Sequence, residues 1–446
     1  MKLSLFNVLK KIDDITIFFN AKTCALAVVD NNFMQVISDI RNNSYNESKY
    51  NSRLIEDMKK AGCIVSNESD ELKELEYYRN LGKYDLTFLA LTIAPTLDCN
   101  FRCKYCFETH RHGVMSISNR VALINFVQKR ISQLKHLSIN WYGGEPLIAK
   151  NVIYSLSEKF MSLCKIHGVE YSAFIITNAS LLKDEDILNF KKYNIRGAQV
   201  TIDGPKEMHD ARRVNCAGVS TFELLLENVN KLLLNDIDVI IRINIDKENI
   251  NSVNDLLSIL KNKIINPEKV KIDFGKVTAL TEVCKSVENE CFGSDEYADL
   301  LLPLYAKAIS YGFVMNRMAV YPSPRFNYCT ADYANSFVID VDGDIHKCWN
   351  HVGNGNQSCG NLKNNDMELS SKYLEWVQWD PFRIEKCKNC NLLPVCMGGC
   401  PDAARQNNNI PVCDSIKFNI DKVIDFYYKQ LRRGTNEVSN KTNECS

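Results

Sequence analysis

The sequence predicts an α/β protein: a partial (β/α)6 TIM-like barrel with a small module before it and a cysteine-rich domain after it. Three observations predict this fold class. Apolar, strand-like segments alternate with helical segments between residues 87 and 320, the preceding residues pattern as a separate unit, and cysteines gather after residue 320. The chain has 446 residues, which favours two or three domains over one. We divide it into 1–86, 87–320, 321–430 and a tail at 431–446 that we expect to be disordered.

The first region, residues 1–86, has the pattern of a small winged-helix-like module. Two apolar, β-branched segments, "ITIFFN" and "ALAVVD", flank a short turn and predict a β-hairpin. A helical segment follows behind an asparagine cap, a second one ends at Gly62, and "CIVS" is a short strand. The polar helical stretch at 71–85 is expected to link this module to the barrel.

The central region repeats a strand-then-helix pattern six times. Such alternation requires parallel strands joined by right-handed crossovers. Because six repeats fall short of the eight of a closed barrel, an open, partial barrel is expected. The six expected strands are 86–95, 136–144, 171–179, 197–204, 238–246 and 269–277.

The composition argues against several classes of partner. Lys plus Arg and Asp plus Glu both number 54, which gives no electrostatic reason to expect nucleic acid or an anionic membrane. No stretch reaches the roughly 18 uninterrupted apolar residues of a spanning helix. The short apolar run at the start is interrupted by charged residues and makes a poor signal peptide, so a cytoplasmic location is expected.

The 18 cysteines are unusual for a cytoplasmic chain, because such a chain cannot easily keep disulfides. Metal binding is the better explanation. There are only 7 histidines, and none has a Cys/His zinc spacing. An all-thiolate metal group such as iron–sulfur is therefore favoured over zinc.

Three of these thiols, Cys99, Cys103 and Cys106, lie close together directly after the first expected strand. In a βα barrel the carboxyl ends of the strands carry the chemistry. Four thiolates would complete the ligands of a [4Fe–4S] cluster. Three leave one iron open to a substrate or cofactor, as in a catalytic zinc site with three protein ligands. A structural metal knuckle or buried free thiols is the alternative.

The spacing C-x3-C-x2-C, with the aromatic Tyr105 before the third cysteine, resembles the radical S-adenosylmethionine (SAM) superfamily. The resemblance extends through residues 87–430. It implies that the free iron chelates the amino and carboxylate groups of SAM, that an electron cleaves the S–C5′ bond, and that the resulting 5′-deoxyadenosyl radical takes a hydrogen atom from the substrate. The protein would orient the reactants and exclude water.

A second stretch, "WYGGEPL", resembles the GGEP motif of the same superfamily. Gly143 and Gly144 would let the backbone approach the methionine moiety, and Glu145 would accept a hydrogen bond from the SAM ammonium. An ordinary turn is the alternative. Arg213 matches a position that contacts the SAM carboxylate. The remaining candidates at strand ends, which could instead be cap or turn residues, are Thr177, Asn178, Thr201, Asp203 and Asn244.

The region 321–430 carries a second cysteine array, which resembles the SPASM extension of radical SAM enzymes. That extension holds two auxiliary [4Fe–4S] clusters, so the resemblance implies three clusters in all, together with SAM. Zinc is the alternative for this array. The resemblance assigns an outer cluster to Cys387, Cys390, Cys396 and Cys413, and an inner cluster to Cys329, Cys348 and Cys400.

The array departs from the fullest SPASM pattern at Ser323, where some members have a further cysteine. The inner cluster then either has an open iron, which a substrate thiolate could occupy, or takes a fourth ligand from elsewhere. The cysteines that could supply this ligand are Cys359, Cys291 and Cys284.

SPASM enzymes mostly modify peptides, and residues 1–86 resemble the leader-recognition module of ribosomal-peptide maturases. A leader peptide could add a strand to the edge of the hairpin, although a structural cap on the barrel is the alternative. We therefore expect a peptide maturase that forms a thioether from a peptide cysteine, or else a carbon–carbon crosslink or an epimerised residue. The expected partners are a precursor peptide and an electron donor such as flavodoxin or ferredoxin, without nucleic acid or membrane.

Two other functions stay open. An anaerobic sulfatase maturase, which oxidises Cys or Ser to formylglycine, would have a carboxylate directly after the position of Cys348, where this chain has Trp349. It would also lack a region like 1–86. A non-catalytic iron–sulfur electron-transfer protein is the other possibility, but it would have no use for an open-site triplet beside a GGEP motif. The sequence names no general base.

Overall fold

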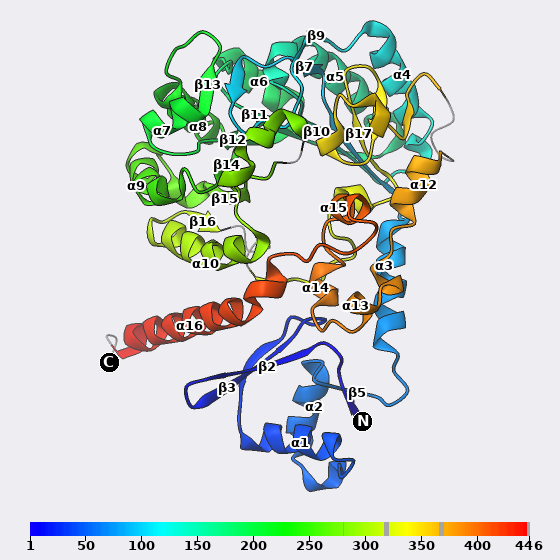
Figure 1. Cartoon of the computed structure of the whole chain (residues 1–446), viewed down its shortest axis with the longest axis vertical. Helices are drawn as coiled ribbons and strands as arrows, with labels where there is room; N and C mark the ends of the chain where they lie inside the picture. Colours follow the sequence, from blue (N-terminus) through cyan, green and yellow to red (C-terminus); the bar gives the residue numbers. More distant parts are fainter. Residues whose placement is uncertain (280, 316–320, 365–369, 444–446) are drawn as a thin grey trace.

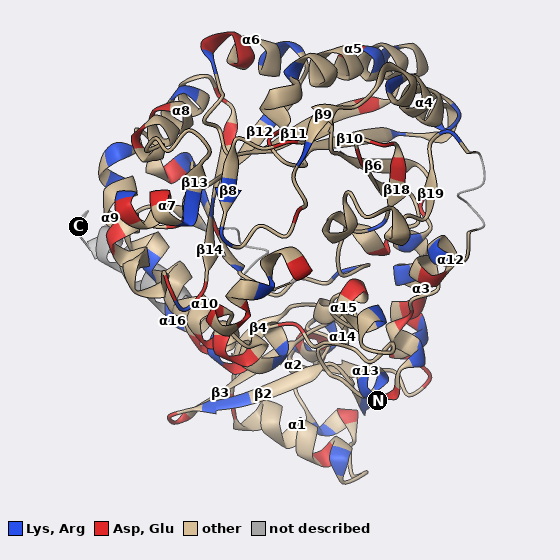
Figure 2. Ribbon diagram, turned by 45° about the horizontal axis from the view of Figure 1, so that its top comes forward, with Lys and Arg blue, Asp and Glu red and all other residues tan. Residues whose placement is uncertain are grey.

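The computed structural model describes residues 1–446 except 280, 316–320, 365–369 and 444–446. The barrel lies at one end, the N-terminal module at the other, and the cysteine-rich segments between them (Figure 1). Figure 2 is turned toward the barrel mouth and shows Lys and Arg interspersed with Asp and Glu over the outer helices. Cys445, in the expected tail, lies outside the described residues.

Six parallel strands pair in chain order, as the sequence predicts. Their order across the sheet is β15-β14-β12-β11-β10-β6. Each neighbouring pair is parallel, so the carboxyl ends of all six strands meet at one rim. The strands are β6 (Phe88–Ile93), β10 (His136–Trp141), β11 (Glu170–Thr177), β12 (Ile195–Thr201), β14 (Asp238–Ile245) and β15 (Lys271–Lys276).

A helix lies between each strand and the next and covers the outside of the sheet (Figure 1). Side chains alternate along the strands, so every second residue of β11 is buried, while the others face the barrel interior. The largest apolar core of the chain fills the space between strands and helices, and it includes Ile175, Val200 and Ile241. The helices are α4 (Ile117–Gln128), α5 (Lys150–His167), α6 (Asp184–Lys192), α8 (Phe222–Leu234), α9 (Val253–Lys263) and α10 (Ser294–Ser310).

The cysteine-rich region also contributes strands to this sheet. The sequence pattern alone indicates an irregular structure for that region. Strand β17 (Ser336–Ile339) pairs in parallel with β6. Beyond β17 the sheet continues through the antiparallel strands β18 (Asp344–His346) and β19 (Gly360–Asn361). Strand β16 (Val314–Met315) extends its other edge. The result is a ten-stranded sheet. The segment holding Cys329 and Cys348 is therefore attached directly to the first barrel strand.

The N-terminal module contains a three-stranded antiparallel sheet, β2-β3-β4, followed by two helices. The predicted hairpin is β3 with β4. The sequence analysis misses β2, because its two adjacent lysines interrupt the apolar pattern. The cap of the first helix is Asp30, not an asparagine. The elements are β2 (Asn7–Ile12), β3 (Ile15–Asn20), β4 (Leu26–Val29), α1 (Asn31–Arg41) and α2 (Ser52–Lys60), with β1 (Lys2–Leu3) and β5 (Ile64–Val65) paired beside them.

One face of this module packs on the cysteine-rich region rather than on the barrel. Phe6, Ile17 and Phe19 share an apolar cluster with Cys387 and Leu393. The expected linker is helix α3 (Glu71–Lys83), which runs alongside the cysteine-rich segments (Figure 1).

The expected disordered tail is instead the end of a helix. Helix α16 (Ile416–Asn443) continues through most of 431–446, although Gly434 lies within it. Near its start it packs against α10, where Asn419 donates a hydrogen bond to the carbonyl of Ala298. Within the described residues, no helix is long and apolar enough to cross a membrane.

Candidate functional site

The cysteine loop, residues 94–108, leaves β6 at the carboxyl rim and carries the first three thiols. Its strand β8 (Phe101–Cys103) pairs antiparallel with β13 (Arg213–Asn215). This pairing sets Cys103 opposite Arg213. The loop is thus fixed to the far side of the rim, beyond β12.

Burial is the main cause that raises the pKa of all three loop thiols, to about 12 for Cys99. The thiols also lie near enough to raise one another's pKa: Cys103 acts on Cys99, and both act on Cys106. Among the described residues, however, these three sulfurs are not a group whose atoms all lie within 4.8 Å of one another. A tetrahedral zinc ion with Zn–S near 2.3 Å holds its sulfurs about 3.8 Å apart. The spacing therefore suits a group larger than a single zinc ion.

The three thiols open onto one cavity of about 320 Å³ at the carboxyl ends of the strands. Besides the three cysteines, the candidate SAM-contacting residues named from the sequence all line this cavity, except Glu145 and Asp203. Those that line it are Tyr105, Gly143, Gly144, Thr177, Asn178, Thr201, Arg213 and Asn244.

The two glycines are required by the cysteine loop itself. A Cβ on Gly144 would lie 2.2 Å from the carbonyl oxygen of Asp98, and one on Gly143 would lie 2.5 Å from that of Thr96. Gly143 also has a positive φ of 105°. The sequence analysis explains these glycines by close approach to a ligand, but their first role is to let two chain segments touch.

Glu145 lies behind the cavity wall and is fully buried. Its Oε1 accepts hydrogen bonds from the Thr177 hydroxyl (2.6 Å) and the Leu147 N–H (2.9 Å), and Oε2 accepts one from the Asn178 N–H (2.7 Å). Since a carboxylate has about four acceptor positions, one is left on Oε2. The first role of this carboxylate is to hold the GGEP turn against the end of β11.

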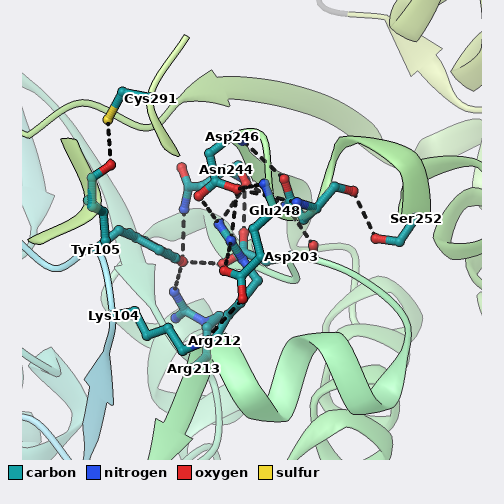
Figure 3. A network of polar contacts seen from close by, with 12 residues as sticks. Lys104, Tyr105, Asp203, Arg212, Arg213, Asn244, Asp246, Glu248, Ser252 and Cys291 are labelled. Atoms are coloured by element: carbon teal, nitrogen blue, oxygen red, sulfur yellow. Dashed lines mark hydrogen bonds and ion pairs between the residues drawn. The ribbon is translucent and has the colours of Figure 1, made fainter. Parts of the chain in front are cut away.

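The hydroxyl of Tyr105 is the centre of a polar network beside the cavity (Figure 3). It donates a short hydrogen bond to Asp203, and it accepts one from Arg213 Nη1 (2.8 Å) and one from Asn244 Nδ2 (3.1 Å). Asp203 also accepts from the backbone N–H of Asn244 (2.8 Å). The network therefore ties the cysteine loop to the ends of β12, β13 and β14.

Arg213 is buried in this network but is only partly satisfied. Its Nε has no hydrogen-bond partner among the described residues, although the side chain lines the cavity. A buried donor without a partner is costly, about 1–3 kcal/mol. Because the residue lines the cavity, its positive charge would attract an anionic oxygen of a ligand there.

Several cavity residues were missed by the sequence analysis: Gln199, Arg242 and Lys276. The alternation of a strand could have revealed two of them. Gln199 is two positions before Thr201, and Arg242 two before Asn244, so each pair shares the inward face of its strand.

An aromatic pair forms the lip of the cavity. Tyr142 and Trp349 stack with ring centroids 5.7 Å apart, and both line the cavity. Tyr142 also forms a hydrogen bond with the buried carboxyl of Glu108. Burial raises the pKa of that carboxyl to about 7. Trp349, 45% exposed, follows Cys348 directly, so the cysteine-rich region supplies part of the cavity wall.

Several thiols of the second cysteine array lie near enough to influence one another's pKa. Burial chiefly raises the pKa of Cys329 and Cys348, and the thiol of Cys400 raises both further. Likewise burial raises the pKa of Cys387 and Cys396 to about 11, with further increases from neighbouring thiols. For both of these, the neighbouring thiols include Cys390 and Cys413.

The candidates for a fourth ligand to the inner group lie in different places. Cys359 shares an apolar cluster with Cys329 and Cys348. Cys284 and Cys291 instead lie on the segment after β15, where their sulfurs bond to nearby carbonyls of that same segment. The Ser323 hydroxyl has no hydrogen-bond partner within the described parts of the chain.

A separate cluster of Asp340, Asp344 and His346 offers three close ligand atoms. The Asp340 carboxylate, however, already accepts hydrogen bonds from the N–H groups of Asp342, Asp344 and Gly353, and it bonds to His346. These four bonds close the β17–β18 turn, so the cluster has a structural role.

The comparisons with known proteins agree with this geometry. Residues 93–260 match the family model of the radical SAM superfamily. The radical SAM cyclopropyl synthase TigE of Paramaledivibacter caminithermalis is 24% identical over 94% of this chain and 94% of its own length. A cysteine-type anaerobic sulfatase-maturating enzyme of Clostridium perfringens (strain 13) is 27% identical over 70% of this chain and 88% of its own.

Two solved structures share the fold. Native anSMEcpe with bound AdoMet has a TM-score of 0.60 at 20% identity, and it covers 78% of this chain and 99% of its own. Streptococcus suis SuiB bound to its precursor peptide SuiA has a TM-score of 0.54 at 14% identity, over 93% and 99%. The likeness to SuiB extends over 93% of this chain and is therefore not confined to the barrel.

Proposed function

Because residues 93–260 form a radical SAM domain, we propose that this chain is a peptide maturase that joins two carbon atoms of a ribosomally made precursor. The observation that carries the proposal is the shared cavity, which is lined by the three thiols of the cysteine loop on one side and by Trp349 on the other. A substrate in this cavity lies between the radical SAM domain and the cysteine-rich region.

The residues present fit a [4Fe–4S] cluster and SAM. Cys99, Cys103 and Cys106 are an all-thiolate donor set whose sulfurs are spread more widely than one zinc ion requires. The positive charge of Arg213, which lines the cavity, suits the carboxylate of SAM. The cavity volume of about 320 Å³ lies in the range of small-molecule sites.

When bound, the cluster and SAM supply a 5′-deoxyadenosyl radical that takes a hydrogen atom from the substrate. The chain supplies the positions. The Gly143–Gly144 turn fixes the cysteine loop, and Tyr105 holds Arg213 toward the cavity. The stack of Tyr142 on Trp349 forms an apolar part of the cavity wall, which would exclude water from the substrate.

Forming one carbon–carbon bond removes two hydrogen atoms from the peptide. One leaves with 5′-deoxyadenosine. The other leaves as a proton and an electron, and an iron–sulfur centre is the chemical class of the electron acceptor. The inner group, Cys329, Cys348 and Cys400, and the outer group, Cys387, Cys390, Cys396 and Cys413, are the ligands we assign to two such centres.

The aromatic lip favours an apolar target side chain. Trp349 and Tyr142 stack on each other and line the cavity, and Trp349 stands where a sulfatase maturase would have a carboxylate. Aliphatic carbons pack well on such rings. The likeness to TigE over nearly the whole chain supports the proposal of a carbon–carbon bond rather than the thioether expected from the sequence.

The N-terminal module has one edge suited to a leader peptide. The β2 edge is covered, since Asn391 donates to the carbonyl of Asn7 (3.3 Å) and Lys10 donates to that of Asp421 (2.6 Å). Within the described residues, β4 pairs only with β3, and its Val28 is 54% exposed. We assign the leader to the β4 edge, where its backbone would add a strand.

Co-expression of the chain with the short reading frames beside its gene tests the proposal. Mass spectrometry is expected to find one peptide that is lighter by two hydrogen atoms, with the change absent when Cys99, Cys103 and Cys106 are replaced by Ala. Fragmentation would place the new bond between two carbons. A thioether would overturn the bond assignment, and a formylglycine would overturn the choice over sulfatase maturation. If no peptide changed mass, the crosslink would be refuted.

A further inference from the structure

A continuous row of polar side chains crosses the barrel interior from β15 to the cysteine loop. Asp273 on β15 pairs with Arg242 Nη1 on β14 through a short contact. Arg242 Nε donates to Asn244 Oδ1 (3.1 Å), and Asn244 Nδ2 donates to the hydroxyl of Tyr105 (3.1 Å). The residues of this row that line the cavity are Arg242, Asn244 and Tyr105.

The fold makes room for Arg242 at one neighbouring residue. A Cβ on Gly275 would lie 1.8 Å from Nη2, 2.0 Å from Cζ and 2.2 Å from Nε of Arg242. Gly275 has no positive φ, so conformation does not explain the glycine. The guanidinium therefore lies flat over the backbone of β15, and any side chain at 275 would displace it.

The row fixes the orientation of one amide. Because Arg242 can only donate, Asn244 must turn its oxygen toward Arg242 and its NH₂ group toward Tyr105. The Tyr105 oxygen then accepts from Asn244 and from Arg213, and its own proton goes to Asp203. With the amide reversed, its oxygen would compete for that proton, and the bond that holds Arg213 would weaken.

We propose that Arg242, held by Asp273 and accommodated by Gly275, is a positioning residue that orients Asn244 and Tyr105 so that Arg213 is aimed at the carboxylate of SAM. It acts from the far side of the barrel, without contact to the thiols. The inference rests on the proposed function only in taking SAM as the ligand of Arg213.

The test measures SAM affinity by equilibrium dialysis with the reconstituted full-length protein. Arg242→Gln is expected to weaken SAM binding about tenfold, which corresponds to about 1.4 kcal/mol. Iron content should be unchanged, because β8 pairs with β13 independently of this row. The KM for SAM should rise, while the rate of 5′-deoxyadenosine formation at saturating SAM should change less. Arg242→Lys should not restore affinity, since a single ammonium cannot reproduce the fork that reaches Asp273 and Asn244.

Gly275→Ala provides the sharper test. It should weaken SAM binding as Arg242→Gln does, although residue 275 does not line the cavity. In the Arg242→Ala background the added methyl meets no guanidinium, so Gly275→Ala should have no further effect. This non-additivity separates displacement of Arg242 from general damage to β15.

Arg196→Gln is the matched control, because Arg196 is exposed and bonds only to Asn194 Oδ1 among the described residues. Unchanged SAM affinity in Arg242→Gln, or additive losses in the double variant, would overturn the inference. If the unaltered protein bound no SAM at all, the proposed function would fail instead.

Discussion

Lys83 and Asp332 form an ion pair of 2.9 Å in which both side chains are fully buried. Arg79, one turn earlier on α3, bonds to the same carboxylate at 3.2 Å, and both cations also donate to the carbonyl of Trp379. Asp332 follows Cys329 by three residues, and its N–H bonds to the carbonyl of that cysteine (3.1 Å). Helix α3 is thus joined by ion pairs to the loop that carries Cys329, the first cysteine assigned to the inner cluster.

Removal of this carboxylate should destabilise the chain strongly. Asp332→Ala removes the anion that the two buried cations share and leaves only the longer contact of Arg79 with Asp380 (4.0 Å), which is expected to cost about 3–5 kcal/mol. Urea unfolding, followed by circular dichroism, measures the loss. Asp299→Ala is the control, because its partner Lys422 is exposed and the pair contributes about 0–1 kcal/mol. Equal midpoints for the two variants would contradict this account of the junction.

A methyl group at residue 144 should displace the cysteine loop. Gly144→Ala places a Cβ 2.2 Å from the carbonyl oxygen of Asp98, and neither backbone segment can move aside easily. We expect the reconstituted variant to lose about one third of its iron, the share of one cluster among the three proposed for this chain. Gly168→Ala is the control: no atom lies within 4 Å of its Cβ, and only the left-handed φ of 68° adds strain. Full iron content in Gly144→Ala would refute the prediction.

Acid should destabilise the chain partly through His209. This imidazole is fully buried, and burial, aided by Arg213, lowers its pKa to about 3 from 6.5. Between these values the unfolded chain binds more protons, so stability falls as the pH decreases, by up to about 1.4 kcal/mol per pH unit. His209→Asn keeps an acceptor for the Asp203 N–H but cannot be protonated. The urea midpoint should change less between pH 6.5 and pH 4.5 in the variant than in the unaltered protein. An equal change in both proteins would show that His209 does not contribute to the acid sensitivity.

Trp349 should determine how tightly the peptide binds. Trp349→Ala removes the stack on Tyr142 and much apolar surface, and it is expected to raise the peptide concentration for half-maximal modification about tenfold, or about 1.4 kcal/mol. Trp349→Phe keeps an aromatic ring, so its half-maximal peptide concentration should lie between those of the unaltered protein and Trp349→Ala. Product formation by mass spectrometry, measured against peptide concentration, gives this order. The same half-maximal concentration in all three proteins would show that the target residue does not rest on this ring.

The sequence predicts the barrel well because its signal is local. Strands such as β11 alternate buried and inward residues over eight positions, and each is followed by a helix. The parallel order then follows from the handedness of the crossovers. The cysteine loop and the GGEP turn could be placed at the rim for the same reason.

The features that the sequence does not predict depend on contacts between distant segments. The pairing of β17 with β6 joins residues about 250 positions apart, and no local pattern marks it. The row from Asp273 to Tyr105 depends on strand register, which places Arg242 opposite Asp273. The three acceptor bonds of Glu145 likewise come from the end of β11 and from its own turn.

The central claim is that Cys99, Cys103 and Cys106 hold the group at which SAM is cleaved. The most direct measurement is 5′-deoxyadenosine formation by the anaerobically reconstituted, dithionite-reduced chain, compared with its triple Cys→Ala variant. The account predicts product from the unaltered protein and none from the variant, which should keep the iron bound by the second cysteine array. Equal product from both proteins, with all iron retained in the variant, would contradict it.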